Sequence, residues 1–472
     1  MEQARDHVAT FPVTRGWKAL WLVLVLSLPL SIRFYFPGLG LEVDVPAEPL
    51  VAIAVIWGSI RTLHSGLKKT VDRIGPFTVI DTLVLALMAG HLIGALFSTD
   101  HVVSVKAMAV QWAFILTFYW FPRTGMVNAR QCLERYAWAL APIMFYAALN
   151  SGWNGLDRAA SNHAAFPFFV DHTAYGAALC FVIPVFLFHA FAKRPVPAPP
   201  GWTVLHVTLV IVAICALVFA YSRGAWLAFM IASISVSMAW MNSPRNRWLL
   251  AGSAAILLGV ILLVTKPASP RIHGQHGMGL GRTWSSLLDS DEPSNADRIM
   301  RWRAAWSMFL DEPITGQGPG TYQDHLPTFV DATTSGPMHS DIHAHTRLKP
   351  IWGNPNGLHV RDHPQRTLSG GGTAHSEYLL AVSEGGGVLG APWLVLAGIL
   401  LTMPLSRTLG QRMRAIPFHS VAVFGTVSYL IHAGVNNFLT DPKLAAPFWW
   451  CAAWIALQKM RAIRVDRQGS IA

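Results

Sequence analysis

Three segments of the chain combine side chains whose types could do chemistry. They are YSRGAWLAF with Arg223, NADRIMRWRAAWSMFLDEP with Arg298, Arg301 and Arg303, and GGTAHSEYLLAVSEGGGVLG with His375 and Glu384. Guanidinium groups bind phosphate and diphosphate oxygens in a forked geometry, and a histidine can act as a general base near neutral pH. Together these residue types suit chemistry on a phosphorylated substrate.

The arginines also have a purely structural interpretation. A guanidinium at membrane depth is costly unless it faces a cavity or a partner, but Arg223 stands at the edge of an apolar run and could snorkel to the interface. On a helix, Arg298 and Arg301 are neighbours, whereas Arg303 points about 140° away from Arg298. A solvated helix face would show the same pattern, so both interpretations remain open at this point.

The segment around His375 predicts a short helix over residues 376–384 that is stopped by Gly385–Gly387. His375, Leu379 and Val382 share one face of this helix, so the histidine would lie above apolar side chains. A histidine that merely begins a helix fits this position as well as a catalytic one does.

The composition indicates that a membrane domain must position these segments. Of the 472 residues, 53% are hydrophobic and only 13% are charged, whereas about 25% are charged in a typical soluble protein. The net charge of +11 does not indicate nucleic acid binding, because the basic residues form short clusters between apolar runs, as cytoplasmic loops do. We expect an all-α polytopic membrane protein that contacts membrane lipids and no nucleic acid.

The apolar runs predict about twelve transmembrane helices, since a bilayer core needs roughly 20 apolar residues per helix. The predicted spans are Ala19–Phe36, Pro46–Ile60, Val79–Phe97, Val102–Trp120, Tyr136–Leu149, Thr173–Ala190, Trp202–Ala220, Ala225–Met241, Trp248–Thr265, Val388–Leu405, Ile416–Phe438 and Ala445–Met460. The first run is longer than the core of a signal peptide and no small-residue cleavage site follows it, so we expect it to be a span.

Lysines and arginines cluster in alternate short loops and at both ends of the chain, whereas the opposite short loops carry few of them. This asymmetry predicts that the basic loops and both termini lie in the cytoplasm. Termini on the same side require an even number of spans, which agrees with twelve.

One long polar segment separates predicted spans 9 and 10 and falls on the outer face. The expected organisation is a membrane domain at 1–265, a long outer loop at 266–374 and a second membrane domain at 375–472. Within the loop, a capping residue and aromatic residues at helical spacing predict a helix near 295–311, which Pro313 ends.

No metal and no cofactor is predicted. The segment HSDIHAH, with His339, His343 and His345, has a spacing that could hold zinc, but no cysteine lies near it. Walker-type loops, GxSxG elbows and HExxH motifs do not occur in the sequence. The four cysteines fall in predicted spans or cytoplasmic loops, so they are not expected to cross-link exposed segments.

The three segments, in this order, resemble motifs of the O-antigen ligase and polymerase superfamily of bacterial membrane glycosyltransferases. SRGAWLAF is similar to its SRG-opening span, DRIMRWRAAWSMFLDEPITGQGPGTY to its R-x3-W-x-A-A … P-x-x-G-x-G-P-G segment, and HSEYLLAVSEGGGVLG to its H-N-x-Y-L-x-x-L-x-E-x-G motif. FFVDHTAYGAAL resembles a further family element, and Ser376 stands where the family pattern usually has Asn. The family has two membrane blocks around a long periplasmic loop, so the resemblance covers most of the chain.

This resemblance implies metal-independent transfer of a glycan from undecaprenyl diphosphate to an acceptor hydroxyl at the periplasmic face of the bacterial inner membrane. Arg223 and Arg298 match the arginines expected to hold the lipid diphosphate. His375 matches the histidine expected beside the acceptor, as a base or as a group that orients the hydroxyl. The remaining predicted substrate-binding residues are the motif carboxylate Glu384 and the neighbouring arginines Arg301 and Arg303.

Ligation of O-antigen onto lipid A-core is the expected reaction. An O-antigen or exopolysaccharide polymerase and a protein O-oligosaccharyltransferase would use the same chemistry on another acceptor, and the sequence leaves them open. A lipid-linked glycan transporter is the alternative from a different class, and it predicts functional charges near mid-span and internal symmetry. The candidate residues cluster instead at one face and in the long loop, which favours a transferase.

Overall fold

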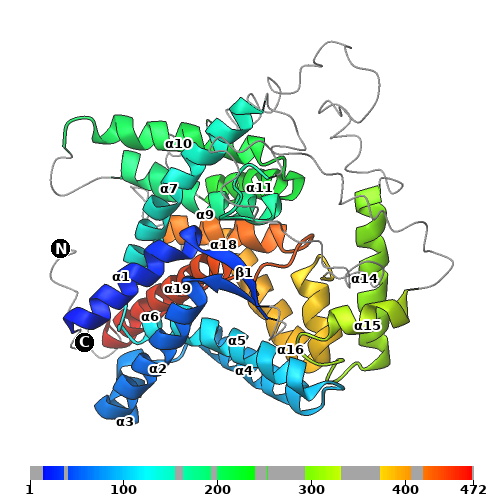
Figure 1. The fold of residues 1–472 in the computed structure, drawn as a ribbon. Coiled ribbons are helices and arrows are strands. Elements are labelled where there is room, and N and C mark those ends of the chain that lie inside the picture. The colour runs from blue at the N-terminus through cyan, green and yellow to red at the C-terminus, as the bar shows by residue number, and fades with distance from the viewer. Residues whose placement is uncertain are drawn as a thin grey trace, which may run out of the picture.

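The computed structural model describes residues 14–36, 41–154, 163–192, 199–239, 252, 293–330, 373–405 and 418–469. Helices dominate these residues (Figure 1), as expected where lipid cannot satisfy backbone hydrogen bonds. In chain order the elements are α1 Arg15–Leu30, β1 Ile32–Phe36, β2 Leu41–Val45, α2 Ala47–Ser65, α3 Leu67–Ile74, α4 Val79–Leu96, α5 His101–Ile115, η2 Leu116–Trp120, α6 Phe121–Arg123, α7 Ala129–Trp153, α9 His172–Phe191, α10 Trp202–Phe219, α11 Arg223–Ala239, α14 Pro293–Asp311, α15 Tyr322–Phe329, α16 Glu377–Leu401, η4 Met403–Leu405, α18 Phe418–His432 and α19 Pro442–Gly469.

Five helical segments among the described residues are long and apolar enough to cross a membrane. They are Val79–Leu96, His101–Arg123, His172–Phe191, Trp202–Phe219 and Glu377–Leu401. The protein is therefore a helical multi-pass membrane protein. The other predicted spans coincide with α1, α2, α7, α11, α18 and α19, except that all of Trp248–Thr265 apart from residue 252 lies outside the described residues. The total of twelve spans stays a prediction.

The predicted span Ala19–Phe36 is wrong in its last six residues. Helix α1 ends at Leu30, and the residues that follow pair as the antiparallel hairpin β1–β2, with Ile32 opposite Val45. The aromatic residues of IRFYF and the alternation of apolar and acidic residues in LEVDV favour such a strand pair over a helix. Similarly, the predicted span Ile416–Phe438 is too long, because α18 ends at His432 and a turn follows.

The hairpin is fixed to the start of α19 by a buried ion cluster. Lys443 Nζ lies 3.1 Å from Asp44 Oδ1, and these side chains are 2% and 1% exposed. Lys443 Nζ also donates to the Phe168 carbonyl at 2.7 Å, and Arg33 reaches Asp44 at 3.1 Å. Three segments far apart in the sequence, namely the hairpin, the residues before α9 and the start of α19, are thereby held together.

The centre of the molecule is formed by α9, α18 and α19 (Figure 1). In α9 83% of the apolar window is buried within the protein, compared with 33% in the segment that contains α5. Helix α9 is therefore a core helix, whereas α5 leaves most of its surface to lipid or ligand. The start of α1 and the end of α19 lie near each other (Figure 1), which agrees with termini on the same side.

The outer loop contributes one long helix that stands beside α16. Helix α14 spans Pro293–Asp311, which confirms the helix predicted near 295–311. Most of 266–374, including the histidines of HSDIHAH, lies outside the described residues. Helix α16 runs through the predicted stop at Gly385–Gly387, but Gly386 has non-helical angles (φ 54°, ψ −150°). The glycines break the helix locally instead of ending it.

Candidate functional site

The start of α11 packs directly against the end of α18. A Cβ at Gly224 would lie 2.6 Å from Cδ2 of His432, so a larger residue there would force the two helices apart. Ser222 Oγ accepts a hydrogen bond from the Ala225 backbone N–H at 3.4 Å and caps α11. The SRG sequence therefore places Arg223 at the N-terminal end of a helix, where the helix dipole favours anions, next to the chain segment that holds His432.

The start of α9 meets the same helix end. At Gly176, α9 approaches α11 so closely that a Cβ would lie 2.9 Å from a side chain of α11. Asp171 caps α9 by accepting a hydrogen bond from the Thr173 backbone N–H at 2.8 Å. The charges of Asp171 and Arg298 both act on the buried ring of His432. Helices α9, α11 and α18 thus pack together at this histidine, and Arg298 of α14 acts on it electrostatically.

Helix α14 holds the segment that carries His375. Arg301 pairs with Asp297 through Nε at 2.8 Å and donates from Nη1 to the Thr373 carbonyl at 3.4 Å. Trp302 donates from Nε1 to the His375 carbonyl at 3.3 Å. These bonds fix the backbone on both sides of Ala374, so α14 positions His375 by its main chain and leaves the imidazole available.

The turn after α18 holds the other side of the same segment. The Ser376 backbone N–H donates to Asn437 Oδ1 at 3.2 Å, and the Glu377 N–H donates to the Ala433 carbonyl at 2.9 Å. The buried Glu377 carboxylate in turn accepts the Leu439 backbone N–H at 2.7 Å. Bonds in both directions therefore lock the start of α16 to residues 433–439.

His375 lies between these two supports in a constrained conformation. Its φ of 49° is left-handed, which is uncommon for a residue with a side chain. Burial lowers the pKa of His375 below its ordinary value of 6.5, and the charges of Arg301 and Arg298 lower it further, whereas Asp297 and a hydrogen bond with Asn436 act in the opposite direction. The imidazole is therefore neutral at neutral pH and able to accept a proton.

Asn436 connects His375 to a second, fully buried histidine. Its Nδ2 lies 3.1 Å from Nε2 of His432, and its side chain also hydrogen-bonds with His375. His432 is only 1% exposed, and its Nδ1 makes no hydrogen bond within the described part of the chain. The three side chains form a row from the core of α18 to the start of α16.

The glycine-rich segment TGQGPGTY is bound to the break in α16. The break at Gly386 leaves the carbonyls of Ser383 and Glu384 without helical partners, and the N–H groups of Gln317 and Gly318 donate to them at 3.0 and 2.8 Å. On its other side the segment touches the tip between α4 and α5, where a Cβ at Gly318 (φ 114°) would lie 2.0 Å from a side-chain oxygen. This motif is a structural clamp between α16 and the α4–α5 tip.

Three of the predicted site residues belong to segments that lie around the end of α18 and the start of α16. Arg298 of α14 acts electrostatically on both His375 and His432, and Arg223 directly precedes the glycine that lies next to His432. The sequence segments that carry these residues are 75 or more positions apart. Their common neighbour is the polar centre formed by His375, Asn436 and His432.

The other predicted residues have different surroundings. Arg301 is 8% exposed and uses two of its nitrogens in bonds to the protein, and Arg303 is exposed on the opposite side of α14. Glu384 lies about 13 Å along the helix axis from His375. Its carboxylate accepts the Tyr322 backbone N–H at 3.1 Å, next to the clamp.

Glu377, His432 and Asn436 lie close to His375 in the structure, although no sequence motif predicted them as site residues. Glu377 was within the quoted HSEY motif, where an acidic residue at the start of an apolar helix could have indicated a buried acceptor. His432 and Asn436 lie in IHAGVNN at the end of an apolar run. Polar residues at membrane depth are expensive and commonly functional, which was the available signal.

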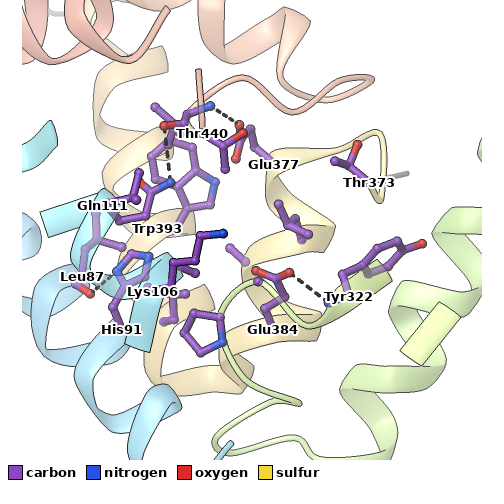
Figure 2. A pocket seen from close by; sticks show the side chains of 18 of the residues that line it. Leu87, His91, Lys106, Gln111, Tyr322, Thr373, Glu377, Glu384, Trp393 and Thr440 are labelled. Atoms are coloured by element: carbon purple, nitrogen blue, oxygen red, sulfur yellow. Dashed lines mark hydrogen bonds between the residues drawn. The ribbon is translucent and has the colours of Figure 1, made fainter. Parts of the chain in front are cut away.

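A cavity of about 380 Å³ lies on the opposite side of the α16 start, between α4, α5, α16 and the glycine-rich segment. Figure 2 shows Lys106 reaching from α5 into this cavity, with Glu377 and Glu384 on the α16 side. Thr373, two residues before His375, also lines it. The cavity therefore adjoins the segment of His375 without including Arg223 or Arg298.

Comparison with known families gives one match. Residues 208–394 match the family model described as O-antigen ligase. This segment of the chain is similar to O-antigen ligases. The match runs from α10 into α16 and includes Arg223, Arg298, His375 and Glu384, whereas His432 and Asn436 lie beyond it. No curated protein gives a significant match.

The match to the O-antigen ligase family indicates a membrane glycosyltransferase type of enzyme in polysaccharide synthesis. The helices long enough to span a membrane agree with this class of enzyme. The resemblance stated from the three motifs is thereby confirmed at the level of the family.

Proposed function

We propose that the protein transfers a glycan from undecaprenyl diphosphate to an acceptor hydroxyl at the periplasmic face of the inner membrane, with lipid A-core as the acceptor. The observation that carries the proposal is the convergence of Arg223, Arg298 and His375 on the end of α18. Cations can stabilise a diphosphate leaving group, and a neutral base can accept the proton of a hydroxyl nucleophile. Arg223 and Arg298 are groups of the first kind, and His375 is a group of the second.

In the proposed step the acceptor hydroxyl oxygen attacks the anomeric carbon of the lipid-linked sugar. The bond from that carbon to the diphosphate oxygen breaks, and the electron pair leaves with the diphosphate. Arg223 and Arg298 stabilise the departing charge, and the loss of one such group costs about 3 kcal/mol of barrier. His375 takes the hydroxyl proton, an effect typically worth about 10²- to 10⁴-fold.

Asn436 and His432 position the base in this scheme. With Asn436 Nδ2 directed at His432, its carbonyl oxygen can accept the N–H of the His375 ring. The second ring nitrogen of His375 then carries the lone pair that receives the proton. A hydrogen bond to one ring nitrogen commonly selects the histidine tautomer in this way.

The test is transfer by the purified full-length chain in lipid, with a glycan on undecaprenyl diphosphate as donor and lipid A-core as acceptor. We expect His375→Ala to reduce the transfer rate about 10²- to 10⁴-fold, with thermal unfolding unchanged. His64→Ala, an exposed residue at the end of α2, is the matched control. Normal transfer by His375→Ala would refute the catalytic assignment.

A gene deletion separates the reactions that share this chemistry. Loss of all long-chain lipopolysaccharide with lipid A-core intact supports ligation. Lipopolysaccharide that carries a single repeat unit indicates a polymerase, and unchanged lipopolysaccharide with loss of glycans from protein indicates an oligosaccharyltransferase.

A further inference from the structure

Both polar and apolar side chains line the cavity beside Lys106. Its polar lining includes Lys106, His91, Gln111 and Glu384, and its apolar lining includes Leu389 and Trp393, with Trp393 next to Gln111 in Figure 2. Its volume of about 380 Å³ is within the range of small-ligand sites. This is room for one terminal sugar and the start of its aglycone, not for a long glycan.

The hydrogen bonds that these polar groups already make determine which donors and acceptors remain for a ligand. His91 Nδ1 bonds to the Leu87 carbonyl at 2.8 Å, so Nδ1 carries the proton and Nε2 is an acceptor. Glu384 uses Oε1 for the Tyr322 N–H, which leaves acceptor capacity on its second oxygen. Gln111 donates from Nε2 to the Leu439 carbonyl at 3.4 Å, which leaves its side-chain oxygen as an acceptor for a ligand.

Lys106 is the cation that faces these acceptors. Figure 2 shows its side chain extending toward the space between Glu377 and Glu384. Within the residues that the structure describes, no carboxylate forms a salt bridge with it, so the ammonium and the carboxylates are separated by more than 4.0 Å. A ligand that both donates and accepts hydrogen bonds can bridge such a gap.

The hydrogen-bonding groups distinguish between ligand classes. A phosphate needs donors for its oxygens, and the lining offers it the Lys106 ammonium, whereas the nearby backbone N–H groups of Tyr322 and Leu439 already donate to Glu384 and Glu377. Sugar hydroxyls both donate to carboxylates and accept from an ammonium, and the flat C–H faces of a sugar pack on aromatic rings such as Trp393. The lining therefore favours an uncharged glycoside.

We propose that this cavity binds the sugar end of the acceptor, with hydroxyls on Lys106 and Glu384 and the apolar side toward Trp393. The assignment to the acceptor rests on the proposed function. The donor diphosphate then binds at Arg223 and Arg298 on one side of the α16 start, and the acceptor sugar binds on the other. His375, two residues from the cavity-lining Thr373, lies between the two sites.

The binding test uses octyl glucoside that carries a photoreactive diazirine in its alkyl chain, added to the full-length chain in nanodiscs. We expect cross-links on peptides of α4, α5 and α16, and competition by excess octyl glucoside but not by octyl phosphate. Lys106→Met should reduce labelling about ten- to one-hundred-fold, as for the loss of a hydrogen bond from a charged group.

Matched variants keep the result interpretable. Lys69→Met, an exposed residue on α3, should label like the wild type. Glu384→Gln keeps an acceptor for Tyr322 and provides a second test if Lys106→Met does not fold. Labelling spread over all helices, equal competition by octyl phosphate, or wild-type labelling of both variants would overturn the cavity proposal.

Transfer kinetics separate this proposal from the proposed function. We expect Lys106→Met to raise the acceptor KM by the factor seen in labelling, with the donor KM unchanged. An unchanged acceptor KM together with lost labelling would remove the acceptor assignment. His375→Ala should label normally, so failure of the catalytic assignment would leave the labelling result intact.

Discussion

Two arginine-containing regions of this protein differ in the contacts that their guanidinium groups make. Arg123, at the end of α6, is fully buried, and its Nε and Nη2 bind the two oxygens of Asp81 at 2.8 and 2.9 Å. Its Nη1 donates to the Ile74 carbonyl at 2.8 Å, and Tyr119 donates to Asp81 as well. The protein itself saturates this guanidinium.

The region around His375 is arranged differently. Two arginines, Arg298 and Arg301, act on a neutral histidine, and the nearest acid, Asp297, is bound to Arg301. Positive potential is therefore concentrated where the protein supplies little negative charge to His375. The comparison shows that the contacts within the fold, and not the residue type alone, separate a structural arginine from a candidate for substrate binding.

The largest effect is expected on the stability of the protein when Arg123, whose guanidinium is fully bonded to the protein, is replaced. Arg123→Ala leaves the Asp81 carboxylate buried without its partner and should destabilise the protein by about 3–5 kcal/mol. Thermal unfolding in detergent would measure this, while the transfer rate per folded molecule stays normal. Wild-type stability in Arg123→Ala would show that the ion pair is not structural.

The next effect concerns the cation that acts on both histidines. Arg298→Gln should raise the barrier to transfer by about 3 kcal/mol, or about 150-fold in rate, with little change in unfolding temperature. Arg298→Lys should recover only part of the activity, because an ammonium lacks the forked geometry. The exposed Arg135→Gln on α7 is the control, and equal activity of all three variants would contradict the assignment.

A smaller effect is expected in the pH profile. Burial and the charges of Arg301 and Arg298 lower the pKa of His375, opposed by Asp297 and Asn436. Transfer should therefore hold its rate down to pH values below 6.5 and fall as His375 becomes protonated. Arg301→Gln removes one lowering charge, so the acidic limb of kcat/KM should move to higher pH. A shift of the acidic limb to lower pH would show that the Arg301 charge does not lower the pKa of His375.

The smallest effect is expected at the helix cap beside His375. Ser376 Oγ accepts the Leu379 backbone N–H at 3.4 Å and caps α16. Ser376→Ala should cost about 1 kcal/mol of stability, seen as a lower unfolding temperature, with the acceptor KM unchanged. A large loss of transfer without a loss of stability would give Ser376 a direct role in the reaction.

Much of the fold could be predicted from local sequence. The helix near 295–311 was predictable because its cap, aromatic spacing and terminating proline lie within one segment. The hairpin at 32–45 was not, because its strands read as an extension of an apolar run until they pair with each other. The glycine-rich segment was recognised as a motif, but its function as a clamp depends on α16 and the α4–α5 tip.

The sequence by itself determined the membrane class, the helical fold, the family motifs and the candidate residues Arg223, Arg298 and His375, because hydropathy, spacing and residue chemistry are local properties. Only the tertiary structure decided that Arg301 supports the backbone, that Asn436 joins His375 to His432, and that Lys106 faces Glu384 across a cavity. These relations join residues from different helices. They exist only once small residues such as Gly224 let those helices approach each other.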